Sequence, residues 1–69
     1  MTTLTVLVNG EPRALPAPAT AADLLRVLEL DPRVVVVELN RRIVRRAALA
    51  AAALSEGDRI ELVHFVGGG

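Results

Sequence analysis

The chain has 69 residues, which suffice for one small domain and are too few for an enzyme with a separate cofactor module. Eight basic residues, all arginine, balance eight acidic ones, so the chain lacks the excess of positive charge that binding to nucleic acid requires. Cysteine is absent, which excludes disulfides, thiolate catalysis and zinc fingers. A single histidine cannot complete a metal site with the ligands that remain, so we expect no metal.

Membrane targeting is not expected from this sequence. The first residues, 1–6, carry no basic segment, and no apolar run is long enough to cross a bilayer. Hydrophobic residues make up 52% of the chain and charged residues 23%, which is typical of a globular domain. We therefore expect a cytoplasmic protein with no membrane partner.

The N-terminal residues predict a β-hairpin. Residues 3–8 alternate between polar and apolar and stop at Asn9-Gly10, the dipeptide most typical of a two-residue hairpin turn. Residues 11–15 would form the returning strand. Pro12 has no N–H to donate to a neighbouring strand, so this second strand should lie at an edge of the sheet.

A helix and a buried strand are predicted next. Thr20 and Asp23 form a capping box that begins a helix over about 21–29, and Asp31-Pro32 would end it. Residues 34–39 are mostly valine and predict a strand that is apolar on both faces. Alternation along this strand turns one set of side chains toward the helix and the other set outward. The inward set is Val35, Val37 and Leu39, and the outward set is Val34, Val36 and Glu38.

The C-terminal half predicts two more strands. Residues 40–42 are a turn candidate before a very short strand at Ile43-Val44. The alanine-rich residues 47–54 favour a helix by propensity, but they could equally form a short helical turn between strands, with residues 47–53 as filler. A turn at 55–58 and a strand at 60–66 precede three glycines. The order predicts an α+β protein, a β-grasp with a small mixed sheet of four to five strands on one helix.

Residues 40–69 also carry a recognisable pattern. It reads Asn40-x-x-Ile43-Val44-x-Arg46, then Leu49 and Leu54, then Gly57-Asp58-x-Ile60-Glu61-Leu62-Val63, and ends Val66-Gly67-Gly68-Gly69. Together with the Asn-Gly hairpin and the Leu24-Leu25 helix, it resembles the ubiquitin-like sulfur carrier proteins of thiazole biosynthesis, the ThiS family. The chain departs from the family at Arg45, where proline is frequent, and at Leu49, where an aromatic residue is frequent.

The resemblance implies a β-grasp domain over 1–66 and a flexible glycine tail over 67–69 that carries the reactive carboxylate. An ATP-using adenylating enzyme, ThiF-like, would activate the Gly69 carboxylate. Sulfur that originates from a cysteine desulfurase would convert it to a thiocarboxylate, which a ThiG-like thiazole synthase would consume. The chain would then be a protein co-substrate without catalytic residues, and ATP would be bound by its partner.

The tail glycines have a physical rationale of their own. Gly67 and Gly68 lack a Cβ, so the backbone can adopt whatever conformation a narrow active-site channel imposes and can deliver Gly69 there. Three extended residues add about 10 Å of reach. The chain shows no phosphate-binding glycine pattern, which agrees with ATP binding by the partner.

A partner-docking patch is predicted near the tail. Its apolar members are Val34, Val36, Val63 and Phe65, and Arg41 and Arg42 are its basic members. Phe65 is the only aromatic residue, and it either anchors this patch or completes the core. The arginines could also belong to a solvated turn or to a nucleic-acid surface, which net neutrality disfavours. His64 is interpreted as structural.

Two other functions stay open. Sulfur carriers for molybdopterin synthesis or tRNA thiolation share the fold and the diglycine end, although the short chain and the Val-Gly-Gly-Gly ending favour thiazole. A non-catalytic β-grasp interaction module with an inert tail is the third possibility, and it predicts that removal of Gly69 changes nothing.

Overall fold

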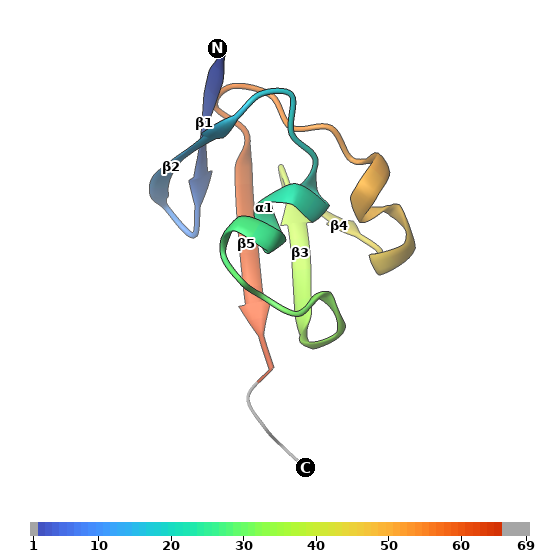
Figure 1. Ribbon diagram of the computed structural model, residues 1–69. Coiled ribbons are helices and arrows are strands. Elements are labelled where there is room, and N and C mark those ends of the chain that lie inside the picture. Colours follow the sequence, from blue (N-terminus) through green and yellow to red (C-terminus); the bar gives the residue numbers. More distant parts are fainter. Residues whose placement is uncertain (1, 66–69) are drawn as a thin grey trace.

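Five strands form one mixed sheet in the computed structural model, which describes residues 2–65, and a single α-helix crosses one face of that sheet (Figure 1). The elements are β1 (Thr3–Val8), β2 (Glu11–Pro16), α1 (Ala21–Val27), the 3₁₀ helix η1 (Pro32–Val34), β3 (Val35–Leu39), β4 (Arg42–Val44), the 3₁₀ helix η2 (Arg46–Ala51) and β5 (Arg59–His64). The strand order is β2-β1-β5-β3-β4, with β1 and β5 parallel and the other pairs antiparallel. This is the predicted β-grasp arrangement.

The N-terminal hairpin is confirmed. Asn9 and Gly10 both have positive φ, 51° and 85°, as a two-residue turn of type I′ requires. Val8 pairs with Glu11 across the turn. β2 lies at the edge of the sheet, as predicted from Pro12, whose missing N–H would cost a hydrogen bond between strands in the centre of the sheet.

Two asparagines fasten the central strand β5 to its neighbours on both sides. The Asn9 Oδ1 accepts a hydrogen bond from the Leu62 N–H at 2.8 Å, and its Nδ2 donates to the Leu62 carbonyl at 3.3 Å. On the other side, the Asn40 Oδ1 accepts from the Arg59 N–H at 3.0 Å, and its Nδ2 donates to the Asp58 carboxylate at 3.1 Å. Each asparagine therefore shapes its own turn and also ties that turn to β5.

The start of α1 is as predicted. The Thr20 Oγ1 accepts from the Asp23 N–H at 3.2 Å, and the Asp23 Oδ2 accepts from the Thr20 N–H at 2.9 Å. This reciprocal pair satisfies two of the N–H groups that a helix start leaves without partners.

The predicted end of the helix is wrong. The helix stops at Val27 rather than near residue 29, because Glu29 adopts a left-handed conformation with φ 57°. The Glu29 N–H donates to the Arg26 carbonyl and the Leu30 N–H donates to the Leu25 carbonyl, a Schellman motif. Asp31-Pro32 does not end α1. Asp31 instead caps η1.

The core lies between the sheet and the layer formed by α1 and η2. Its most deeply buried large side chains are Val6, Leu24, Val37 and Ile60. Val35 and Val37 face this layer as predicted. Val34, however, belongs to η1 rather than to the strand, so β3 begins one residue later than predicted.

The alanine-rich connector takes the second of its two open alternatives, a short helical turn between strands. It is a 3₁₀ helix, and it is not filler, because Leu49 is 4% exposed within the core. An isolated β-bridge joins Ala53 to Thr20, which places the connector beside the start of α1. β5 covers Arg59–His64, so it begins one residue earlier than predicted and ends before Phe65, and Val66 lies outside the described residues.

Glu29→Gly is expected to stabilise the fold. A side chain costs about 1–2 kcal/mol in the left-handed region, and the greater freedom of glycine in the unfolded chain offsets part of that gain. We predict a net increase of about 0.5–1 kcal/mol in the free energy of unfolding, measured by urea titration. Glu29→Ala keeps the Cβ and serves as the control. Equal stabilisation by Ala and Gly would show that the left-handed conformation is not the cause.

Candidate functional site

The face of the sheet opposite α1 carries the predicted apolar patch. Val36 lies directly opposite Val63 in the β3–β5 register, and the Phe65 N–H donates to the Val34 carbonyl at 2.8 Å. Residues opposite each other in an antiparallel pair share a face, so the Val36 and Val63 side chains lie together, and the backbone hydrogen bond places Phe65 beside Val34 at the adjoining end of the two strands. Val63 and Phe65 are 53% and 59% exposed. Phe65 is therefore part of the surface patch and does not complete the core.

Ile43 extends this surface and was missed by the sequence analysis. It lies opposite Glu38 on the edge strand β4 and is 68% exposed. A signal for it was present, because a two-residue turn at Asn40-Arg41 fixes the register that pairs Ile43 with the outward-facing Glu38. We use the term outer apolar patch for Val34, Val36, Ile43, Val63 and Phe65.

Arg41 and Arg42 do not join the outer apolar patch. Arg41 lies in the β3–β4 turn with φ 70°, at the opposite end of β3 from Val34. At about 3.3 Å per residue, the five residues of β3 separate the two ends by about 15 Å. Arg42 lies opposite Leu39, which packs against the core, so its side chain leaves β4 on the helix-covered face. A docking role for these arginines remains a prediction, at a separate place on the surface.

The chain leaves β5 beside the outer apolar patch. Phe65 is the last described residue and contacts Val34 through its backbone. Gly67, Gly68 and the predicted sulfur-bearing Gly69 lie outside the described residues. The patch therefore includes Phe65, the last residue that the structure describes before these glycines in the sequence.

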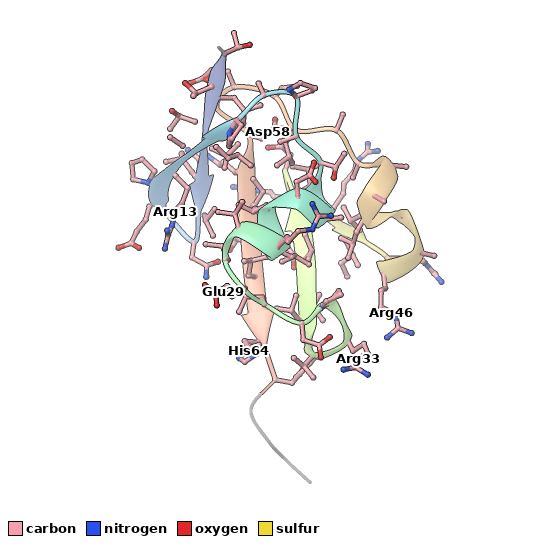
Figure 2. The ribbon with its side chains drawn as sticks, viewed as in Figure 1. Arg13, Glu29, Arg33, Arg46, Asp58 and His64 are labelled. Atoms are coloured by element: carbon pink, nitrogen blue, oxygen red, sulfur yellow. The ribbon has the colours of Figure 1, made fainter. Side chains whose placement is uncertain are left out.

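His64 points away from the patch. It lies opposite the buried Val35, which places its side chain on the helix-covered face, where it remains exposed. It borders a shallow groove of about 320 Å³ that Leu28, Leu30 and Arg13 also line. Glu29 lies on the same side of the molecule, whereas Arg33 and Arg46 lie on the other (Figure 2).

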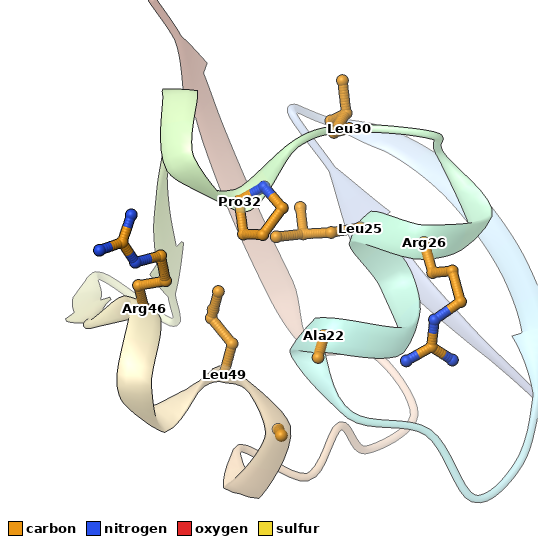
Figure 3. Close-up of a pocket in the computed structure, with 8 residues that line it drawn as sticks. Ala22, Leu25, Arg26, Leu30, Pro32, Arg46 and Leu49 are labelled. Carbon is orange, nitrogen blue, oxygen red and sulfur yellow. The ribbon is translucent and has the colours of Figure 1, made fainter.

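A second hollow of about 310 Å³ separates α1 from η2 (Figure 3). Its walls are mainly apolar, and they include Leu25, Leu30, Pro32 and Leu49. Arg26 and Arg46 stand at its rim. Arg26 forms an ion pair with Asp23 at 3.0 Å.

The carboxyl groups of Asp23 and Asp31 have clearly lowered pKa values, and both groups cap helical segments. Hydrogen bonds from the side chain and backbone of Arg33, together with its charge, lower the pKa of Asp31 to about 2. Hydrogen bonds from the backbone and side chain of Thr20 lower the pKa of Asp23. Both carboxylates are held in their charged form by structural contacts, which stabilise η1 and α1. Neither lies on the outer apolar patch.

The described part of the chain offers neither a metal-binding cluster nor a membrane-spanning helix. Residues 2–65 bring together no group of three or more His, Cys, Asp or Glu side chains that could hold a metal ion. Over the same residues, no helix has the length and apolar character that crossing a bilayer requires.

The fold and the exposed face define a β-grasp protein of the ubiquitin-like class. Residues 6–69 match the model of the ThiS family, so the chain belongs to the ThiS family. The sulfur carrier protein ThiS of Bacillus subtilis is 42% identical over 50 residues, which cover 72% of this chain and 76% of that protein. The crystal structure of the thiamine biosynthesis protein ThiS from Geobacter metallireducens superposes with a TM-score of 0.79 at 32% identity, covering 96% of this chain and all of that one.

Two much longer proteins also contain a similar segment. A thiazole synthase of Magnetococcus marinus is 45% identical over 62 residues, or 90% of this chain. A thiazole synthase of Paramagnetospirillum magneticum is 42% identical over 64 residues. This chain spans about a fifth of the length of each, 19% and 20%.

Phe65→Ser should leave the fold almost as stable as before, because the ring is more than half exposed. We predict a loss of less than about 1 kcal/mol in the free energy of unfolding. Leu24→Ala is the contrasting variant. Its side chain is 1% exposed, and the loss should be about 2–5 kcal/mol. Urea titration of both variants checks this, and a comparable loss for the two would place Phe65 in the core.

Proposed function

We propose that this protein is a sulfur carrier of thiamine thiazole biosynthesis and that Gly69 bears the sulfur as a thiocarboxylate. The observation that carries the proposal is the extent of the family match, which runs through the glycines to residue 69. The Bacillus subtilis relative is itself named a sulfur carrier protein. The alternative acceptors, molybdopterin and tRNA, gain no support from any relative described above.

The Gly69 carboxylate has to be activated by a partner enzyme before sulfur can replace one of its oxygen atoms. A carboxylate is a poor electrophile, so it first attacks the α-phosphorus of ATP and releases pyrophosphate. In the resulting acyl-adenylate, AMP is a good leaving group that a sulfur nucleophile can displace. We propose that an adenylating enzyme binds the ATP and that a cysteine desulfurase supplies the sulfur as a persulfide. Attack of the persulfide on the acyl-adenylate releases AMP and forms an acyl disulfide. A thiol such as cysteine then cleaves the S–S bond, which releases the thiocarboxylate and leaves the thiol oxidised as a disulfide. Dependence on ATP supports a cytoplasmic location.

Thiazole synthase is the proposed acceptor. Two proteins with that name contain a segment similar to nine-tenths of this chain, so carrier and synthase occur there on one polypeptide. Such linkage keeps the carrier at a high effective concentration near the synthase. It supports the view that this carrier domain meets the same enzyme.

The structure suggests how the work is divided between the folded body and the glycines. The outer apolar patch includes Phe65, which directly precedes residues 66–69 in the sequence. Contact through this patch would hold the body outside the partner's active site. Gly67 and Gly68, without Cβ atoms, would let the terminus pass through a narrow entrance. The carrier then contributes reach and docking, and its partners contribute the catalysis.

Intact-mass spectrometry tests the proposal. The protein is incubated with ATP, cysteine, a cysteine desulfurase and the adenylating enzyme of its source organism. We expect the mass to rise by the difference between one sulfur and one oxygen atom. Omission of ATP should abolish the rise, because AMP is the leaving group.

A chain that lacks Gly69 is the matched control, since it keeps the whole described fold. It should show no increase in mass. An unchanged mass for the complete protein, in a mixture that converts the Bacillus subtilis carrier, would contradict the proposal and favour an interaction module with an inert tail.

A further inference from the structure

Two glutamates face each other in the middle of the outer sheet face. Glu38 on β3 lies directly opposite Glu61 on β5, and the Val36–Val63 pair stands two residues away on the same face. Like charges directly opposite in neighbouring strands destabilise a sheet. The carrier therefore holds an unfavourable charge pair next to its outer apolar patch.

The described residues do not neutralise this pair. Among residues 2–65, the ion pairs are Arg26–Asp23 and Arg33–Asp31, both away from this face. Arg59 lies two residues before Glu61 on the same face, yet no ion pair within 4.0 Å joins them. Neither glutamate accepts a hydrogen bond from a side chain in this part of the protein. The two carboxylates are thus available to a group from outside.

The surroundings of the pair indicate what that group is. Val36 and Val63 border it along the strands, and Ile43 lies beside Glu38 on the next strand. A partner that covers these apolar side chains would remove water from the carboxylates. Desolvated carboxylates require a cation, and an arginine can reach two carboxylates with one guanidinium.

We propose that thiazole synthase docks on this face and inserts an arginine or lysine side chain between Glu38 and Glu61. The inference rests on the proposed function and adds the chemistry of the contact. The choice of thiazole synthase follows from the two relatives in which a similar segment and the synthase share one chain.

A second copy of the protein is a poor occupant of the same face. A twofold-symmetric contact presents the same patch from both copies, so it would bring four carboxylates together. The pair therefore opposes self-association through the outer apolar patch while it attracts a basic partner.

The test measures binding of the source organism's thiazole synthase to the carrier and to Glu38→Gln, Glu61→Gln and the double variant. Titration calorimetry at low and moderate salt should show a loss of affinity of at least about 10-fold for the double variant. Glu61→Lys should lose more, because it repels the inserted cation. Glu11→Gln is the matched control, since it makes the same charge change at an exposed site opposite the buried Val8 and should bind as the wild type does.

Thermal unfolding checks that the variants fold and that the repulsion is real. Removal of one charge should raise the melting temperature by about 1–4 °C at low salt, and the gain should shrink as salt is added. Sedimentation at high concentration should show a monomeric wild type. A wild-type dimer that Phe65→Ser disrupts would overturn the proposal in favour of a second copy.

The two proposals fail in different ways. Failure of the wild type to form a thiocarboxylate removes the proposed function itself. The inserted cation is overturned if the thiocarboxylate forms normally and the double variant binds thiazole synthase as tightly as the wild type does. It is also overturned if the wild type forms the thiocarboxylate but does not bind thiazole synthase. In both cases the carrier function remains intact.

Discussion

The parallel pairing of β1 with β5 is the constraint on which the rest of this structure depends. It brings segments from opposite ends of the sequence together at the centre of the sheet, with Val8 beside Ile60. The Leu7 N–H donates to the Asp58 carbonyl and the Asn9 N–H donates to the Ile60 carbonyl, both at 2.9 Å. The Asn9 side chain extends this connection to Leu62. With β5 fixed in the centre, its last residues extend past the end of β1 while they stay paired with β3, and their side chains alternate between the two faces.

The two faces of the sheet then have different roles. α1 and η2 cover one face and bury the core, whose most deeply buried large side chains include Leu24, Val37 and Ile60. The outer face keeps Ile43, Val63 and Phe65 more than half exposed. A domain this small could bury more apolar surface by covering both faces, which would add stability. The exposed face is the surface through which we propose that a partner binds.

Local signals explain how much of the fold could be predicted. The Asn9-Gly10 turn, the Thr20–Asp23 capping box and the alternation along β3 are encoded within a few neighbouring residues, and all three are confirmed. The end of α1 could not be read in the same way, because Glu29 occupies a left-handed position that usually holds glycine. The secondary structure of the connector could not be decided from sequence, because its alanines favour a helix locally. The burial of Leu49 in the core determines the path that the connector takes.

The sequence also predicted only part of the candidate site, because local patterns reveal which side chains share a strand face but not how the strands are aligned. Val36, Val63 and Phe65 follow from strand alternation, but Arg41 and Arg42 were grouped with them by their basic character alone. Register and strand ends separate the arginines from the patch and bring Ile43 toward it.

The central claim is that the carrier meets its enzyme through the outer face of the sheet. Amide chemical shifts of the labelled carrier, recorded as thiazole synthase is added, test it most directly. The account predicts that the affected amides gather on β3 and β5 around Val36, Val63 and Phe65, and that α1 and η2 change little. Shifts confined to the hollow between α1 and η2, with the outer face unchanged, would contradict it.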